Sequence, residues 1–153
     1  MVFWVQFDGL WSPPMSTSLR ISDAAVLGLH TAVLLAANPG RPLSTSAVSA
    51  ELQVSEAHLS KVLQRLAKAG LVGSVRGPKG GYILRRPGEE IALLEVFEAL
   101  EGPFPTGECL LPSRICGNGA NCILGSLIHT INTQMREYLG ETTLAAMTRV
   151  YKG

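Results

Sequence analysis

Residues 54–84 read VSEAHLSKVLQRLAKAGLVGSVRGPKGGYIL, and this stretch decides the fold. Its first half predicts a helix that begins after an N-cap at Ser55 and stops at Gly70. Apolar side chains at helical spacing form one stripe, which is expected to face a core: Leu59, Val62, Leu63 and Leu66. A second stripe on another face carries basic groups: His58, Lys61, Arg65 and Lys68. The expected helix is therefore amphipathic, with a basic outer surface.

The second half of the stretch predicts a β-hairpin. Two short runs rich in strand-forming residues, LVGSV at 71–75 and GYILRR at 81–86, are joined by a glycine-rich turn that begins at Arg76. Its glycines permit a close approach of the backbone to phosphate or to a minor groove, and Arg76 and Lys79 supply positive charge. A two-stranded wing is therefore expected directly after the basic helix.

Two more helices are expected upstream of the basic helix. The first covers 23–37 after an N-cap at Ser22 and is apolar almost all round, so it should be buried on more than one side. The second starts near Ser44 or Thr45 and breaks around Gln53. A short helix, a tight turn and a basic helix place a recognition helix in the major groove of DNA. The alternative is a solvated basic face on an ordinary helical protein, which the wing makes less favourable.

Downstream, residues 91–102 (IALLEVFEALEG) predict a helix with apolar residues at helical spacing, and a loop covers 102–120. A long helix is expected from Asn121 to about Leu139. Its apolar residues form a near-heptad stripe: Leu124, Leu127, Ile128, Ile131, Met135 and Tyr138. Core packing would explain this stripe, but pairing with a symmetry mate is the favoured interpretation.

The expected fold is mainly α with a small β wing. Residues 19–88 form a winged helix-turn-helix domain, and 89–153 carry the cysteine loop and the dimerisation helices. Residues 1–18 are set apart as an N-terminal extension: they lack a positive n-region and a cleavage site, which argues against a signal peptide. Two interpretations of this segment stay open, a misassigned start codon or an added piece of chain.

Charge is unevenly distributed along the 153 residues, although the net charge is only +1. Between residues 55 and 86 there are seven basic residues and one acid, whereas from residue 87 onward there are eight acids and four bases. One surface is therefore expected to face phosphate and another to serve a different purpose. The longest apolar run, 24–37, is too short and too interrupted for a membrane span, so no membrane is expected as a partner.

Three cysteines, Cys109, Cys116 and Cys122, lie within fourteen residues. Because the count is odd and the cysteines are clustered, they are interpreted as reduced, cytoplasmic thiols available to a metal rather than as a disulfide framework. Thiolates are the usual ligands of iron–sulfur clusters, and a cluster is the favoured interpretation over zinc or free thiols. The chain shows no nucleophile with an adjacent base, no phosphate loop and no C-x-x-C pair, so an enzyme is not expected.

The stretch at 54–84, the helix after it and the clustered cysteines together resemble the Rrf2 family of winged-helix transcription regulators. The resemblance covers about Leu19 to Met147 and is most specific at 70–84 combined with the cysteine spacing. It is closest to the iron–sulfur type, which includes an iron–sulfur cluster regulator and a nitric-oxide-sensing repressor. It implies a cytoplasmic homodimer that binds a palindromic operator, most often as a repressor, and carries a two-iron or a four-iron cluster.

The resemblance also implies DNA contacts from the basic helix and the wing. The matching positions are Ser55, Ala57, His58, Ser60, Lys61, Arg76, Pro78 and Lys79, and the basic stripe adds Arg65. Ser60 stands where the iron–sulfur regulator has a glutamate that affects site choice. The operator sequence therefore does not transfer.

The fourth cluster ligand departs from the pattern. The iron–sulfur regulator has a histidine three residues after the third cysteine, and here that position is Gly125. Asp23 matches the position from which nitric-oxide-sensing relatives supply an aspartate across the dimer, although an acid in the first turn of a helix is also stabilised by the macrodipole. His30 and His129 are weaker candidates. The expected signal is nitric oxide, redox state or iron status, and the alternative is a metal-independent regulator that responds by thiol oxidation.

Overall fold

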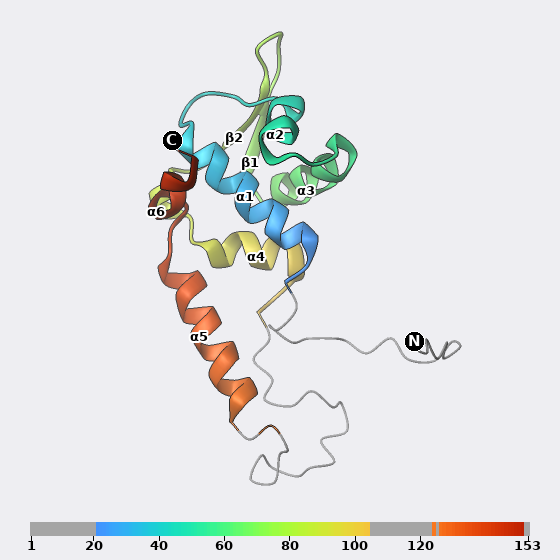
Figure 1. Ribbon diagram of the computed structural model, residues 1–153. Helices are drawn as coiled ribbons and strands as arrows, with labels where there is room; N and C mark the ends of the chain where they lie inside the picture. Colours follow the sequence, from blue (N-terminus) through green and yellow to red (C-terminus); the bar gives the residue numbers. More distant parts are fainter. Residues whose placement is uncertain (1–20, 105–123, 125, 152–153) are drawn as a thin grey trace, which may run out of the picture.

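The computed structural model describes residues 21–104, 124 and 126–151. Figure 1 shows helices arranged around α1, with one hairpin projecting from them. The fold is mainly α with a two-stranded wing, as the sequence predicts. In chain order the elements are α1 (Asp23–Ala37), α2 (Thr45–Leu52), α3 (Glu56–Lys68), β1 (Val72–Val75), β2 (Gly81–Leu84), the 3-10 helix η1 (Gly88–Glu90), α4 (Leu93–Glu101), α5 (Leu127–Glu141), α6 (Leu144–Met147) and η2 (Thr148–Tyr151).

Serine caps begin the first three helices: those at Ser22 and Ser55 are predicted from the sequence, and α2 begins where its start is predicted, near Ser44 or Thr45. The hydroxyl of Ser22 accepts a hydrogen bond from the Ala25 N–H at 3.1 Å, and Ser44 and Ser55 cap α2 and α3 in the same way. Between α2 and α3, Gln53 adopts a left-handed conformation with φ of 55°. This turn sets the direction in which α3 leaves α2.

The core lies where α1 meets the other helices. α1 contacts α3, α4, α6 and η2, which explains why it is apolar almost all round. The apolar stripe predicted for α3 is fully buried: Leu59, Val62, Leu63 and Leu66. The apolar side chains of α4 also face the core: Leu93, Val96, Phe97 and Leu100. Both amphipathic predictions are confirmed.

The wing is an antiparallel pair in which Val72 faces Leu84 and Val75 faces Gly81. The sequence assigns Gly81 to the turn as well as to the second strand, and the structure places it in β2. The reason is a contact outside the hairpin: Leu43, just before α2, exchanges two backbone hydrogen bonds with Tyr82, at 2.8 and 3.1 Å. The turn-proximal part of β2 is thereby attached to the segment just before α2.

Gly81 allows this attachment because it has no side chain. A Cβ built there would lie 2.3 Å from the carbonyl oxygen of Leu43 and 2.7 Å from the backbone nitrogen of Ser44. Gly81→Ala is therefore expected to lower the free energy of unfolding by about 1–3 kcal/mol, measured by urea titration. The matched control is Gly140→Ala in α5, where the nearest atom to a new Cβ is an ordinary 3.7 Å away. An equal loss in both variants would show that close packing at Gly81 is not the cause.

The C-terminal helix begins later than its prediction. It was expected from Asn121, but Leu124 and Ser126 form a turn and α5 begins at Leu127. The intervening Gly125 is a poor helix former, which is a physical reason for the late start. The residues of the predicted apolar stripe also differ in exposure: Ile128 is buried, whereas Leu127 and Tyr138 are 52% and 56% exposed.

α5 packs on α4 and leaves apolar side chains on its surface. Its end is joined to the start of α4, since the Leu93 N–H donates to the carbonyl of Thr142 at 2.9 Å. In the part of the chain that the structure describes, no helix combines the length and apolar character needed to cross a membrane.

Candidate DNA-binding surface and the position of Asp23

The exposed face of α3 carries most of the residues expected to contact DNA. Ser55, Ala57, His58 and Lys61 are exposed, and Ser60 is half-buried beside them. All of them lie in the first half of the helix, opposite the buried stripe. A helix N-terminus of this kind also offers backbone N–H groups and a positive dipole end to a phosphate.

The wing supplies the second half of this surface. Arg76, Pro78 and Lys79 are exposed at its turn, which the Gly80 N–H closes by donating to the Gly77 carbonyl at 2.9 Å. Figure 1 shows the hairpin extending past α2, away from α4 and α5. Two separate elements therefore present cations, an arrangement that suits the phosphates on either side of a groove.

Three of the seven basic residues in this region form contacts inside the protein instead. Arg65 donates to the carbonyl oxygen of Leu100 at the end of α4. Arg86 pairs with the carboxylate of Glu95 and donates to the carbonyl of Glu90, and the Arg85 Nε donates to the carbonyl of Val72 at 3.3 Å. Sequence reasoning missed these contacts because their partners lie on other elements. All seven basic residues are nevertheless exposed: Lys61, Arg65, Lys68, Arg76, Lys79, Arg85 and Arg86.

Ser55 has two expected tasks that substitutions separate. Its hydroxyl caps α3 by accepting from the His58 N–H at 3.2 Å, so Ser55→Ala is expected to lower the free energy of unfolding by about 1 kcal/mol. Ser55→Asp keeps a capping acceptor but adds negative charge at the end of α3 that is expected to face DNA. We expect Ser55→Asp to keep near-normal stability, measured by urea titration. Its DNA binding should be weaker, measured by fluorescence anisotropy with the same duplex as for the wild type. If Ser55→Asp binds DNA as the wild type does, Ser55 does not belong to the DNA-binding surface.

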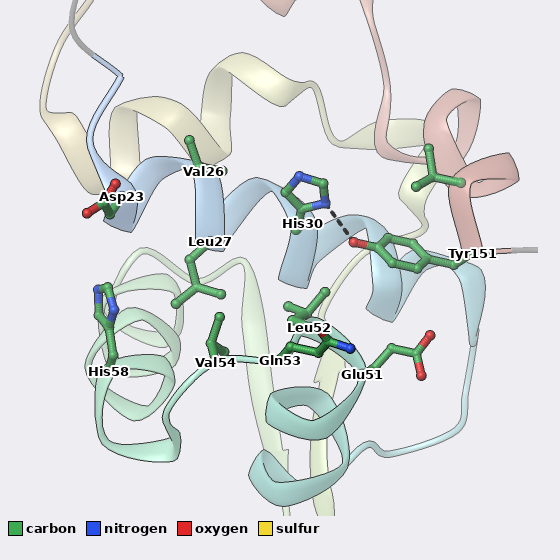
Figure 2. Close-up of a pocket in the computed structure, with 11 residues that line it drawn as sticks. Asp23, Val26, Leu27, His30, Glu51, Leu52, Gln53, Val54, His58 and Tyr151 are labelled. Atoms are coloured by element: carbon green, nitrogen blue, oxygen red, sulfur yellow. Dashed lines mark hydrogen bonds between the residues drawn. The ribbon is translucent and has the colours of Figure 1, made fainter.

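Asp23 lies in the first turn of α1 and is exposed. It borders a groove of about 620 Å³ between α1, the α2–α3 turn and η2. Figure 2 shows Asp23 and Tyr151 toward opposite ends of this groove, with His30 between them. The preceding residue, Ser22, donates a hydrogen bond to the carboxylate of Glu101. The beginning of α1 is thus attached to the end of α4, after which the cysteines follow.

Of the weaker ligand candidates, His30 lines the same groove as Asp23, and His129 lies on another helix. His30 Nδ1 is 2.7 Å from the hydroxyl of Tyr151, and the two rings meet edge to face (Figure 2). Burial, with the nearby Glu51 carboxylate as a smaller cause, raises the pKa of Tyr151 above its usual value. The phenol therefore stays protonated and can donate to His30. His129 lies on α5, remote from this pair in the chain.

The cysteine site itself lies outside the described residues, because Cys109, Cys116, Cys122 and Gly125 all fall in the gaps between described ranges. Among residues 21–104, 124 and 126–151, no group of three or more His, Cys, Asp or Glu side chains is placed to hold a metal ion. The geometry of a cluster site is therefore left to proposal.

Comparison with known proteins identifies the family. A family described as an iron-dependent transcriptional regulator, Rrf2, matches residues 21–149. A chain of Neisseria meningitidis serogroup A named as an HTH-type transcriptional regulator is 34% identical over 102 residues, which are 67% of this chain and 68% of that one. The solved structure of CymR, the global cysteine regulator of B. subtilis, has a TM-score of 0.74 and 29% identity, covering 86% of this chain and 97% of CymR. That of T. potens IscR has a TM-score of 0.68 and 28% identity, covering 88% and 89%. The chain belongs to the Rrf2 family of transcriptional regulators.

Proposed function

We propose that this chain is a homodimeric repressor that binds an operator through α3 and the wing. The observation that carries the proposal is the pairing of the exposed N-terminal half of α3 with the cationic turn of the wing, on the two elements that a winged helix uses. The proposed contacts are Ser55, Ala57, His58, Ser60, Lys61, Arg76, Pro78 and Lys79. The exposed apolar side chains Leu127 and Tyr138 make α5 the proposed dimerisation helix.

The proposed sensor is an iron–sulfur cluster held by Cys109, Cys116 and Cys122, with Asp23 as the fourth ligand across the dimer. Three thiolates suit iron, and a carboxylate is an oxygen donor that can complete the set. Asp23 is exposed, so its carboxylate is accessible to a cluster held by a partner subunit. The residues present are therefore chemically compatible with a cluster.

A bound cluster would supply a centre that responds to iron supply, redox state or nitric oxide. The chain's own residues would transmit its state: the ligands restrain the segment that follows α4, and α4 packs against both α1 and α3. Cluster loss would remove that restraint and change the population of the dimer that binds DNA. The description of the family as iron-dependent supports an iron-linked signal in particular.

Two measurements test this function. The first selects duplexes from a random DNA pool with the purified protein, and enrichment of a palindrome is expected. The second records the absorption spectrum and the iron and sulfide content after purification without oxygen. Enrichment of no sequence would overturn the DNA-binding part, whereas a colourless, iron-free protein that binds the palindrome normally would overturn the cluster part.

The second candidate function is a metal-independent regulator whose thiols respond to oxidation. The likeness to CymR, the global cysteine regulator of B. subtilis, supports this alternative. It predicts that the affinity for the selected duplex follows thiol oxidants and reductants in protein that holds no iron. An iron-free protein whose DNA binding ignores such reagents would exclude it.

A further inference from the structure

The end of α4 meets α1 and α3 at a single crowded point. A Cβ built at Gly28 of α1 would lie 2.0 Å from Cδ1 of Leu100 and 3.4 Å from Cγ1 of Val62. Leu100 and Val62 are both buried, so the space normally taken by a side chain at position 28 is filled by α4. A movement of the last turn of α4 would therefore displace α3, the helix expected to contact DNA.

Arg65 reinforces this junction from α3. Its guanidinium donates a hydrogen bond to the carbonyl oxygen of Leu100, one of the helix-terminal carbonyls that have no partner within the helix. A cation at this end of α4 also interacts favourably with the helix dipole. Arg65 lies one turn beyond Lys61, so a single helix carries both a proposed DNA contact and the bond to α4.

The chain that follows α4 and leads to the cysteines is held against α4 by hydrogen bonds and by ring packing. The N–H groups of Gly102 and Phe104 donate to the carbonyl and the carboxylate of Glu98, both at 2.9 Å. The ring of Phe104 is buried 5.6 Å from that of Phe97. The chain is therefore restrained up to Phe104, and Cys109 follows five residues later.

We infer that Arg65 is a positioning residue that couples α3 to the cysteine segment, rather than a contact to phosphate as its place in the basic stripe predicts. A change at the cysteines shifts the end of α4, and the Arg65 hydrogen bond passes that shift to α3. Since such coupling is reciprocal, DNA bound to α3 must in turn change the environment of the cysteines. The inference rests on the proposed DNA binding but not on the presence of a cluster.

The test uses metal-free, reduced full-length protein in which Cys109 is the only cysteine, obtained with Cys116→Ser and Cys122→Ser. The rate of maleimide alkylation of Cys109 is measured with and without the palindromic duplex selected by the wild-type chain. We expect the duplex to change this rate by about 5-fold or more. Arg65→Ala should abolish the change, and Arg65→Lys, which can still donate to the carbonyl, should retain part of it. The control is Lys68→Ala, which removes the same charge from α3 and should keep the full effect.

The dependence of DNA affinity on salt gives the second readout. Arg65→Ala should keep the wild-type slope of log K against log salt, because the guanidinium contacts Leu100 and not a phosphate. Three outcomes would each overturn the inference. They are a smaller salt slope in Arg65→Ala, a duplex effect on the alkylation rate that survives Arg65→Ala, and an alkylation rate of Cys109 that the duplex leaves unchanged when Arg65 is intact. If the random pool yields no duplex, the proposed DNA binding fails first, and the inference fails with it. Thermal unfolding of Arg65→Ala and Arg65→Lys separates lost coupling from lost folding.

Discussion

Arg76→Ala combined with Lys79→Ala is expected to weaken binding of the selected duplex by about 100- to 1,000-fold near physiological salt. Both side chains are exposed at the turn of the wing. A homodimer would lose four cations, and each phosphate contact contributes about 0.9 to the slope of log K against log salt, so the slope should fall by roughly 3–4. Fluorescence anisotropy titrations at a series of salt concentrations measure both quantities.

The matched control removes the same charge from the C-terminal elements. Arg136→Ala combined with Arg149→Ala also takes two exposed cations from each chain, but from α5 and η2. Long-range attraction alone would weaken DNA binding equally in both double variants. Equal slopes would therefore contradict a wing that contacts phosphate, whereas a reduced slope confined to the wing variant would support it. Urea titration should show near-wild-type stability for the wing variant, since neither side chain belongs to the core.

The parts of the fold that depend on local sequence were predictable. The caps at Ser22 and Ser55 and the buried stripe of α3 are confirmed because hydroxyl capping and helical periodicity involve residues within one turn or two of each other. The wing was predictable for the same reason, since its strands are neighbours in the chain.

Contacts between distant residues were not predictable in this way. Arg65 has the spacing of a DNA-contacting cation, and only the folded chain shows its guanidinium at Leu100, 35 residues away. The pairing of Leu43 with Tyr82, which fixes Gly81 in β2, is equally non-local. The late start of α5 at Leu127 is a different case: Gly125, a poor helix former, is visible in the sequence, but the prediction followed the apolar stripe alone.

If the proposed iron–sulfur cluster is present, replacing Cys109, Cys116 and Cys122 together by serine is expected to remove it entirely. Serine keeps the size of cysteine but offers a poor, protonated hydroxyl in place of a soft thiolate. Protein purified without oxygen should therefore lose its visible absorption, and its iron and sulfide content should fall to near zero. Its affinity for the selected duplex should differ from that of the cluster-loaded wild type by about 5- to 150-fold, the usual range of coupling between two sites.

The reference state for this comparison is wild-type protein from which iron has been removed by a chelator under reducing conditions. The triple serine variant should bind DNA as this metal-free protein does, since both lack the cluster. If instead the wild type also lacks iron, and the serine variant differs from it only in failing to respond to oxidants, the thiol-based alternative is the better account.

Asp23→Asn separates the two interpretations of Asp23 in the same assays. A ligand role predicts an altered absorption spectrum and faster loss of iron, because the neutral amide is a weaker donor than the carboxylate. A purely structural role at the N-terminus of α1 predicts an unchanged spectrum and a loss of about 0.3–1 kcal/mol in the free energy of unfolding, as the favourable interaction with the helix dipole disappears. Ser22→Ala serves as the control, because it removes the N-cap of α1 and the hydrogen bond to Glu101 but leaves the Asp23 carboxylate in place. A spectrum changed equally by both variants would indicate that the position of α1, and not the Asp23 carboxylate, affects the cluster.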